Sequence, residues 1–565
     1  MSKKNKNKIA NSNVENFREL VERYKQFGDN IAFQYKKKKE IQDVTYDQYV
    51  NDIKAIGTAI LNLGVERVAI IGNNRYEWCT SYIAITTSGK VAVPLDKALT
   101  DKEIEKLIRR SGVEAIIYDE KFQNAVNDCD LKYKICMDNI EQEGVTKYEN
   151  LLKQGYELLE KGHNEYYDVK IDKNKMAVML FTSGTTNEPK AVMLSQYNLC
   201  SQVSVLAEHV QLYPTDTLLS FLPIHHTFEC MITFLYGTYC GATVAFCEGL
   251  KYIAQNLKDY KITVFVAVPL VLETMYKKIQ KGIVDSGKKP LIDKMEKISN
   301  GLLKCHIDFR KILFKPVLKQ FDEDLRVVLY GAAPMDKTTI LGYNAFGIEL
   351  VQGYGLTEHG PVIATETSKL KRPGSIGIPL PNTQVKIENP DKDGVGELLA
   401  KGTSVMLGYY ENEEATKKAI DKDGWLHTGD FAYIDDDGFI FITGRKSDII
   451  VLRNGKNIYP QELEFLINKL PYVEECMVYS RNKTKTDTVL GAKIVYNKDA
   501  IIEKFGDKSQ EEYQEKVWED IKEINKELPT YKHIKEITIT DEPLEKTTTQ
   551  KVKRFVEIKK LENVK

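Results

Sequence analysis

Phe181-Thr182-Ser183-Gly184-Thr185-Thr186-Asn187-Glu188-Pro189-Lys190 is the stretch that decides the fold. Apolar runs on either side, at 178–181 and 192–194, predict two short buried strands. The loop between them suits a polyphosphate, because backbone N–H groups and hydroxyls can converge on phosphate oxygens while a lysine adds positive charge. A solvated turn rich in Ser, Thr and Gly is the alternative, since such turns commonly connect strands.

The spacing of this loop excludes a Walker loop. A Walker loop has the pattern GxxxxGK[ST] before a helix, whereas here Pro189 precedes Lys190 and Ala191 follows it. The stretch instead resembles the phosphate loop of the adenylate-forming enzymes, the superfamily of acyl-CoA synthetases, nonribosomal adenylation domains and beetle luciferase. Their pattern is TSGTTGxPKGV, and Asn187 and Ala191 occupy positions where glycine is usual. We expect Ala191 to make the exit from the loop slightly bulkier.

Three further stretches resemble the same superfamily in the same order: LPIHHTFE at 222–229, GAAP at 331–334 and QGYGLTE at 352–358. The first resembles the segment that lines the acid pocket and contains His226; the second resembles the strand end beside adenine. The resemblance implies that Tyr354 stacks on adenine, that Thr357 hydrogen-bonds the α-phosphate and that Glu358 coordinates Mg²⁺. These roles suit an aromatic face, a hydroxyl and a hard carboxylate. A glycine-rich structural turn is the alternative for the third stretch.

The C-terminal part carries two more resemblances. HTGD at 427–430 places Asp430 where the family binds the ribose hydroxyls, and Arg445 in GRKSD would grip the ribose at a domain junction. PLEKTTTQKVKR at 543–554 resembles the closing motif whose lysine bridges the carboxylate substrate and the α-phosphate, which assigns that role to Lys551. Gln550 replaces the usual glycine there, and a solvated lysine-rich tail is the alternative.

The resemblance therefore implies a complete set of site residues. Lys551, Thr357, Glu358 and His226 would be catalytic, and Glu358 would also bind the metal ion. The residues expected to bind ATP or coenzyme A are Thr182, Ser183, Gly184, Thr185, Thr186, Lys190, Gly331, Ala332, Gln352, Gly353, Tyr354, Asp430, Arg445 and Gly455.

Composition favours a small-molecule enzyme. The chain has 565 residues and a formal net charge of -1, which argues against nucleic-acid binding by bulk electrostatics. Nine cysteines without CxxC spacing suggest buried thiols in a reducing compartment rather than a zinc site or a disulfide framework. The basic start lacks the apolar segment of a secretory signal, so we expect residues 1–14 to be a disordered tail and the protein to be cytoplasmic.

Alternating helical patterns and short apolar runs predict an α/β protein. The expected architecture is a large layered α/β N-terminal domain with a β-rich subdomain, at residues 15–444, and a small mobile α+β C-terminal domain at 445–565. The uncharged segment 230–247 contains two glycines and several hydroxyl groups, so we interpret it as a buried helix that turns into a strand rather than as a membrane span. A hairpin is expected at 435–438, another at 454–455, and a helix from Pro460.

These resemblances imply an AMP-forming acid–thiol ligase that uses ATP, Mg²⁺ and coenzyme A on a carboxylic acid, most similar to the long-chain fatty acid branch. A free-standing enzyme that loads a carrier protein and a non-catalytic nucleotide-binding homologue are the alternatives. The helical insertion at 277–319 contains twelve basic and four acidic residues. Interleaved apolar residues there suggest peripheral contact with an anionic membrane, and a solvated insertion is the alternative.

Overall fold

The computed structural model describes residues 12–182, 188–304, 307–318, 324–451, 457–482, 488–546 and 552–563. These residues form two compact units. The first comprises residues 1–386, 399–427 and 436–440, and the second comprises 387–398, 428–435 and 441–565. Each unit is described by itself.

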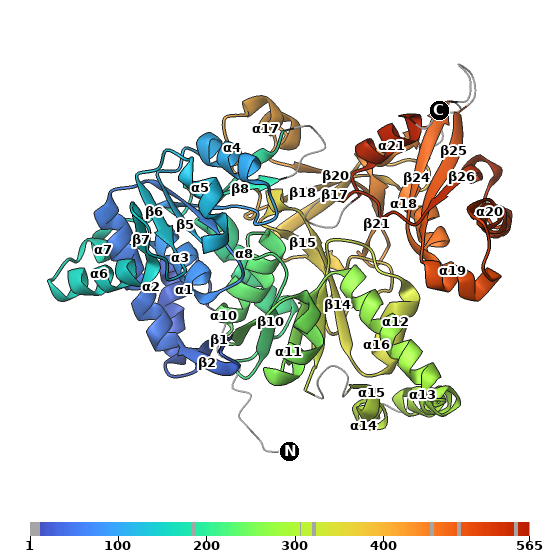
Figure 1. Cartoon of the computed structure of the whole chain (residues 1–565), viewed down its shortest axis with the longest axis horizontal. Coiled ribbons are helices and arrows are strands. Elements are labelled where there is room, and N and C mark those ends of the chain that lie inside the picture. The colour runs from blue at the N-terminus through green and yellow to red at the C-terminus, as the bar shows by residue number, and fades with distance from the viewer. Residues whose placement is uncertain are drawn as a thin grey trace. The chain divides into compact units, whose positions relative to one another are not determined.

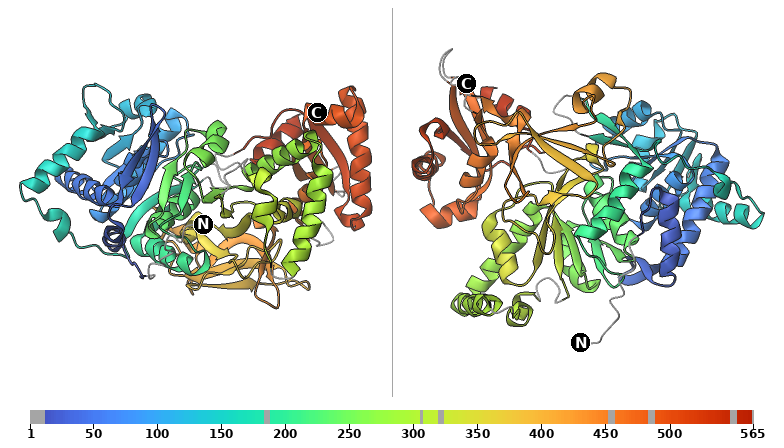
Figure 2. Two further views of the ribbon diagram at one scale, coloured as in Figure 1. Left: turned by 90° about the horizontal axis from the view of Figure 1, so that it is seen from below. Right: turned by 180° about the vertical axis from the view of Figure 1, so that it is seen from behind.

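The first unit is built on two large sheets flanked by helices (Figures 1 and 2). The nine-stranded sheet has the order β16-β15-β14-β13-β12-β10-β11-β1-β2. Its central pairs from β1 through β14 are parallel, while β2, β15 and β16 join antiparallel. The strands are β1 (Ile31–Lys37), β2 (Glu40–Thr45), β10 (Thr217–Ser220), β11 (Thr243–Phe246), β12 (Val264–Ala267), β13 (Val327–Tyr330), β14 (Glu349–Gly355), β15 (Val362–Thr365) and β16 (Ile378–Pro379).

The eight-stranded sheet contains the strands on either side of the predicted phosphate loop and has the order β19-β9-β8-β4-β3-β5-β6-β7. The predicted flanking strands are confirmed as β8 and β9, which form an antiparallel hairpin, whereas β4 and β8 are parallel. A connection this short between β8 and β9 allows only antiparallel pairing. The strands are β3 (Arg67–Ile71), β4 (Val91–Pro94), β5 (Ala115–Tyr118), β6 (Tyr133–Cys136), β7 (Val145–Lys147), β8 (Met176–Thr182), β9 (Lys190–Ser195) and β19 (Gly408–Tyr409).

Continuous apolar strands lie between helices, as the sequence predicts. Every residue of β5, β12 and β13 is buried, which is typical of parallel strands that are covered on both faces. The main helices of this unit are α1 (Phe17–Tyr24), α2 (Tyr46–Leu63), α3 (Tyr76–Thr87), α4 (Asp101–Ser111), α6 (Tyr148–Glu160), α8 (Gln196–His209), α11 (Ile253–Asp259), α12 (Pro269–Asp285), α16 (Lys337–Ala345) and α17 (Glu413–Ala419).

The uncharged segment 230–247 is a buried helix followed by a strand, as expected. A π-helix, η3 (Cys230–Tyr236), continues into α10 (Gly237–Tyr239) and then into β11. Gly241 makes the turn at φ +75°, and a Cβ there would meet the Phe27 ring at 2.4 Å. In the described part of the chain, no helix combines the length and apolar character that crossing a membrane requires.

The basic insertion is helical, which confirms that expectation. The end of α12 leads into α13 (Lys289–Lys304), α14 (Arg310–Leu313) and α15 (Lys315–Leu318), which appear in light green in Figure 1. Apolar side chains of α14, α15 and the segment between them, such as Phe314 and Val317, pack into the second hydrophobic core cluster together with α12 and α16.

The second unit contains the sheet β24-β25-β26 and the helices α18, α19, α20 and α21. Pro460 occupies the first turn of α18, so the predicted start is confirmed, and Leu463 and Ile467 are fully buried on one face of the helix. α20 turns one apolar face toward the core, because Val517 and Ile521 are fully buried. The bounds are α18 (Pro460–Ile467), β24 (Val473–Asn482), β25 (Thr488–Tyr496), α19 (Lys498–Phe505), α20 (Gln510–Lys526), β26 (Ile534–Thr540) and α21 (Arg554–Asn563).

A four-stranded sheet, in the order β17-β18-β20-β21, contributes segments to both units. The expected turn at 435–438 joins β20 to β21. The expected hairpin at 454–455 lies outside the described residues, although the flanking strands β22 (Ile450–Val451) and β23 (Asn457–Ile458) pair antiparallel. The sheet strands are β17 (Thr383–Glu388), β18 (Gly396–Gly402), β20 (Leu426–Ile434) and β21 (Ile440–Arg445).

Residues 12–14, which the sequence assigns to a disordered tail, make contacts with the folded protein. Residues 1–11 lie outside the described residues, but Val14 is only 3% exposed and its N–H donates to Ser204 Oγ at 3.0 Å. The hydroxyl of Tyr239 donates to the Ser12 carbonyl at 2.8 Å. The prediction of a disordered tail is therefore wrong for residues 12–14. The described cysteines are free thiols, buried except for the half-buried Cys247.

Candidate active site

The adenine end of the predicted site lies where β13 and β14 finish side by side. The two strands are parallel, with Tyr330 opposite Gln352. A Cβ on Gly331 would come within 2.6 Å of the Gly353 carbonyl oxygen, so only glycine fits this close approach. Ala332 follows at φ +71°, a left-handed conformation that few non-glycine residues adopt. The carboxyl ends of parallel strands are where α/β sheets bind ligands.

Gln352 and Tyr354 have different environments on β14. Gln352 is buried, and its Oε1 accepts a hydrogen bond from the Tyr330 hydroxyl at 2.9 Å. Its backbone N–H donates to Glu366 Oε2 at 3.1 Å. Hydrogen bonds to Tyr330 and Glu366 therefore hold Gln352 in place. Tyr354 is half-buried at the strand end, where its aromatic face can stack on a purine.

Thr357 and Glu358 follow β14 in a short turn, η5 (Thr357–His359), and each contacts a distant segment. Thr357 Oγ1 lies 3.4 Å from Thr227 Oγ1, which belongs to the LPIHHTFE stretch. Glu358 Oε1 accepts a hydrogen bond from the Tyr409 hydroxyl at 2.9 Å. The structure thus brings one predicted catalytic residue, Thr357, next to the segment predicted to line the acid pocket.

Lys190 lies close to Tyr409, the residue that contacts Glu358. Its Nζ lies 4.9 Å from the centre of the Tyr409 ring, within range of a cation–π interaction. Tyr409 is 7% exposed, and burial raises the pKa of its hydroxyl well above the usual value, so the hydroxyl keeps its proton for Glu358. Tyr409 therefore joins the phosphate-loop lysine to the predicted metal-binding carboxylate.

The ends of the phosphate loop are fixed by the β8–β9 hairpin. Thr182 pairs with Lys190 across the hairpin, and its Oγ1 donates to the Lys190 carbonyl at 3.4 Å. Ser183, Gly184, Thr185, Thr186 and Asn187 lie outside the described residues. Ala191 is a buried, regular residue of β9, and its carbonyl accepts from the Tyr410 N–H at 2.8 Å. A side chain at position 191 therefore belongs to the sheet and not to a loop exit, contrary to our expectation.

A small apolar pocket, with a cavity volume of about 10 Å³, lies beside Thr227. His225 lines this pocket and pairs with Asp96, with Nε2 and Oδ1 3.4 Å apart. His226 does not line it; its Nδ1 accepts from the Phe228 N–H at 3.4 Å and caps a short helix, α9 (Thr227–Glu229). The lining residues are Tyr82, Pro94, Leu180, Leu199, His225, Thr227, Cys230, Met231 and Leu235.

In the second unit, Asp430 and Arg445 form an ion pair across neighbouring strands. Arg445 Nε lies 3.0 Å from Asp430 Oδ1, and the Asp430 side chain is 7% exposed. The backbone N–H of Asp430 donates to Thr428 Oγ1 at 3.1 Å. Both predicted ribose-binding residues are thus held together. Lys551 and Gly455 lie outside the described residues.

His359, next to Glu358, is a buried neutral imidazole. Its Nδ1 lies 3.0 Å from the Val362 carbonyl and donates to it, while Nε2 has no hydrogen-bond partner among the described residues. Burial lowers the pKa of His359 to about 4. The ring therefore carries no charge near neutral pH, and it anchors the turn that holds Thr357 and Glu358.

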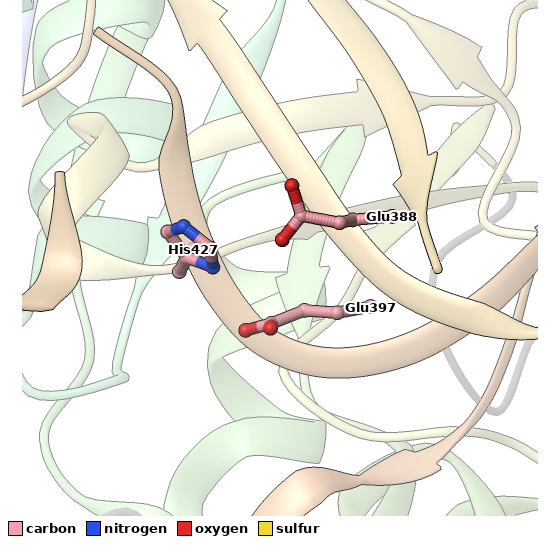
Figure 3. A group of neighbouring side chains, drawn as sticks. All are labelled: Glu388, Glu397 and His427. Atoms are coloured by element: carbon pink, nitrogen blue, oxygen red, sulfur yellow. The ribbon is translucent and has the colours of Figure 1, made fainter. Parts of the chain in front are cut away.

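A separate group of possible metal ligands lies on β17, β18 and β20. One ligand atom from each of Glu388, Glu397 and His427 lies within 4.8 Å of the others (Figure 3). Lys446 Nζ already lies 2.7 Å from Glu397 Oε2 and supplies a positive charge there. An ion pair accounts for the buried carboxylate, so we assign no metal site to this group.

Comparison with known proteins decides the family. The family model for the AMP-binding enzyme matches residues 20–410, and the model for the AMP-binding enzyme C-terminal domain matches 447–563. The chain belongs to the AMP-binding enzyme family. Among solved structures of similar fold is the o-succinylbenzoate CoA synthetase of Bacillus subtilis bound to its acyl-adenylate intermediate. It has a TM-score of 0.73 and 22% identity, over 96% of this chain and 97% of that one.

Curated relatives of this AMP-binding enzyme include two proteins of Arabidopsis thaliana. Long chain acyl-CoA synthetase 4 is 28% identical over 476 residues, which cover 78% of this chain and 71% of the relative. The chloroplastic long-chain-fatty-acid–[acyl-carrier-protein] ligase AEE15 is 26% identical and covers 94% of this chain and 84% of the relative.

Sequence reasoning missed two residues of this AMP-binding enzyme that contact the predicted catalytic residues. Thr227 contacts Thr357, and Tyr409 contacts Glu358. Thr227 lies inside a quoted motif, where the adjacent histidine drew attention instead. Tyr409 follows a glycine in a stretch without a distinctive pattern, and only the pairing of β19 with β9 brings it to Lys190 and Glu358.

Proposed function

We propose that the protein activates a carboxylic acid with ATP to form an acyl adenylate and then transfers the acyl group to the thiol of coenzyme A. The observation that carries this proposal is the grouping of Thr357 and Glu358 with Thr227, Tyr409 and Lys190, a set of hydroxyl groups, a carboxylate and a cation at the end of β14. Membership of the AMP-binding enzyme family supports it, and relatives named long-chain acyl-CoA synthetases support a long-chain fatty acid as the substrate.

The residues suit this chemistry on electrostatic grounds. A carboxylate that approaches the anionic α-phosphate meets a repulsion of roughly 4 kcal/mol per charge pair at an effective dielectric constant of 20. Lys190 and Lys551 would offset this repulsion, and Thr357 would donate a hydrogen bond to the α-phosphate. The substrate carboxylate itself attacks the α-phosphorus and pyrophosphate leaves, so no nucleophilic side chain is needed; the thiol then displaces AMP.

The structure also fits a magnesium ion. Glu358 offers a hard carboxylate, one oxygen of which is already oriented by the Tyr409 hydroxyl, and Mg²⁺ in nucleotide sites usually takes one or two carboxylates together with substrate phosphates. We propose Glu358 as its protein ligand. When bound, Mg²⁺ would neutralise charge on the transferring and departing phosphates.

The decisive experiment is ATP–pyrophosphate exchange with coenzyme A omitted, using acids from acetate to oleate. We expect exchange with medium-chain or long-chain acids. If no acid supports exchange, adenylate formation is excluded. Lys551→Ala should abolish exchange but largely spare thioester formation from supplied acyl adenylate, and equal loss in both half-reactions would contradict its assigned role.

A carrier-protein ligase is the second candidate function, because one relative is named for that activity. Formation of product with coenzyme A and with a purified acyl carrier protein, measured side by side after adenylation, separates the two. We expect coenzyme A to be the better acceptor.

We also propose that the insertion contacts an anionic membrane surface. Six of the sixteen exposed large apolar side chains in the described part of the chain lie at 277–319, and seven exposed lysines accompany them. Exposed apolar and basic groups within one segment fit the boundary of an anionic bilayer. The apolar residues are Val284, Leu291, Ile298, Ile307, Phe309 and Ile312; the lysines are Lys277, Lys278, Lys281, Lys288, Lys289, Lys294 and Lys297.

Vesicle co-sedimentation tests this contact. Charge reversal of Lys281, Lys288 and Lys289 to glutamate should release the protein from anionic vesicles, and neutral vesicles should not bind it. Reversal of Lys153, Lys175 and Lys392, whose side chains are 77%, 81% and 89% exposed, is the matched control and should have little effect. Equal effects of the two sets, or binding unaffected by either, would exclude this surface.

A further inference from the structure

Glu229 is a fully buried carboxyl group that no step of the proposed reaction uses. It ends α9, immediately before the π-helix η3, and its side chain is satisfied by two hydroxyl groups. Ser220 Oγ, at the end of β10, donates to Glu229 Oε1 at 2.7 Å. Thr233 Oγ1, on η3, lies 2.8 Å from Oε2. Glu229 thus connects the π-helix to the end of a central strand.

The connection continues to the end of β3 through Asn74. Asn74 Nδ2 donates to Ser220 Oγ at 2.9 Å and to the Leu222 carbonyl at 2.7 Å. Asn74 Oδ1 accepts from the Ile224 N–H at 3.3 Å. The carboxyl group, the serine and the asparagine together hold the loop that carries His225 and Thr227.

The same loop and helix form one wall of the apolar pocket. Thr227, Cys230, Met231 and Leu235 line it, whereas Glu229 does not. A cavity of about 10 Å³ has room for about one water molecule, so an acyl chain needs side chains that line the pocket to move while the backbone of the wall stays in place. π-Helical turns are rare and are often found at functional sites. The Glu229 contacts are therefore placed to set the position of this wall.

The charge environment favours the neutral acid. Complete burial raises the pKa of Glu229 to about 8, even though the two hydroxyl groups and Lys97 act in the opposite direction. Lys97, after β4, is the cation that faces it, and burial lowers the pKa of Lys97. The thiols of Cys79 on α3, Cys230 on η3 and Cys247 after β11 also interact with it. As an acid, Glu229 can donate from Oε2 to Thr233 while Oε1 accepts from Ser220.

We propose that Glu229, as a neutral carboxylic acid, is a positioning residue that holds the pocket wall at 227–236 against the ends of β3 and β10, so that binding of the acyl substrate requires Glu229 to be protonated. This inference rests on the proposed function of the pocket. It extends that function by making acid binding, rather than nucleotide binding, sensitive to alkaline pH.

A matched pair of threonine substitutions tests the positioning role. Thr233→Val removes the hydroxyl that contacts Glu229, whereas Thr238→Val removes an equally buried hydroxyl nearby that pairs with Tyr24 at 2.8 Å. In ATP–pyrophosphate exchange, Thr233→Val should raise the KM for the acid about fivefold with kcat nearly unchanged, the size expected for one hydrogen bond. Thr238→Val should leave the KM for the acid unchanged. Equal effects of the two variants would overturn the proposal.

Glu229→Gln tests the protonation requirement, because the amide keeps the shape and can donate at any pH. Binding of a fatty acid without ATP is measured by calorimetry from pH 7 to 9.5, together with the melting temperature. Wild-type affinity should fall about tenfold over this range, whereas Glu229→Gln should bind within threefold of wild type at pH 7 and stay flat. A wild type that stays flat, or a variant that falls equally, contradicts the inference. Failure of every acid in the exchange assay would instead contradict the proposed function.

Discussion

At the scale of single residues, Tyr409 shows how one side chain can organise a site that motifs only outline. Its hydroxyl donates to Glu358, and its ring faces Lys190. Tyr409→Phe keeps the ring and removes the donor, so we expect adenylation to fall about tenfold and the Mg²⁺ concentration for half-maximal activity to rise. Stability should fall by about 1 kcal/mol, the net value of one hydrogen bond.

The adjacent Tyr410 supplies the control for this substitution. Its hydroxyl accepts from Arg67 Nη1 at 2.9 Å and takes no part in the site. Tyr410→Phe should change stability by a similar amount and leave the Mg²⁺ dependence unchanged. Titration of Mn²⁺ binding by electron paramagnetic resonance, in the presence of ATP, adds a readout that is independent of turnover. Unaltered metal binding in Tyr409→Phe would show that the hydroxyl does not orient Glu358.

His359 makes the fold sensitive to acid. Because burial lowers its pKa from 6.5 to about 4, the unfolded state binds a proton in this window and the native state does not. Stability therefore falls as pH drops from 6.5 to about 4, by roughly 3 kcal/mol in total. Glu229, whose pKa is raised to about 8, acts in the opposite sense. Its contribution to the stability of the protein is lost as pH rises from 4.5 to 8.

The comparison that isolates His359 is wild type against His359→Asn, because Asn can replace the Nδ1 donor to Val362 and does not titrate. Urea unfolding at pH 7 and pH 4.5 should show the wild type losing about 2 kcal/mol more than the variant. Identical losses would mean that His359 is protonated in the native state.

How much of the site could be predicted from sequence depends on how local each contact is. Thr357 and Glu358 sit three to four residues beyond Tyr354 in one motif, so their proximity follows from the chain itself. The Tyr409–Glu358 contact spans 51 residues and depends on β19 pairing with β9, which no local pattern encodes. The same limit applies to His225 and His226, since the rotation of a single turn decides which ring meets the pocket.

At the scale of elements, the close approach of β13 and β14 makes a sharp prediction about Gly331. A methyl group there would meet the Gly353 carbonyl oxygen at 2.6 Å, so Gly331→Ala must push the strand ends apart. We expect a loss of about 1–3 kcal/mol, typical of overpacking, and weaker ATP binding. Gly301→Ala, in α13 with nothing within 4 Å of the added Cβ, should instead stabilise the protein by about 0.5–1 kcal/mol. Urea unfolding and ATP calorimetry of both variants check this contrast.

Periodicity and turn residues predict the elements well where one strong signal exists. Pro460 at the start of α18 and Gly241 before β11 are such signals, because proline fixes a φ suited to the first turn of a helix and glycine tolerates the positive φ of the turn. The tail boundary could not be predicted in the same way. The N–H of Val14 donates to Ser204 Oγ, which lies 190 residues further along the chain. Amino-acid composition gives no information about contacts between residues so far apart in the sequence.

At the scale of the whole molecule, the chain folds as two units with separate cores, and in the second unit the C-terminal helix packs its apolar side chains against β24 and β25. Arg554, at the start of α21, donates from Nη2 to both oxygens of the buried Glu464, at 2.5 and 2.7 Å. Removing one partner of a buried ion pair typically costs about 3–5 kcal/mol. Arg554→Met should therefore destabilise the second unit selectively, whereas Lys559→Met, at an exposed position of the same helix, should not.

Hydrogen–deuterium exchange measures this selectivity directly. Amides of β24 and β25 should exchange faster in Arg554→Met, because these strands belong to the same unit as the broken ion pair. Amides of β12 and β13, in the first unit, should exchange at the wild-type rate. Acceleration in both units would mean that they unfold as one cooperative body, and acceleration in neither would mean that α21 contributes little to the second core. Selective acceleration would make the C-terminal helix, which begins three residues after Lys551, a structural part of the second unit.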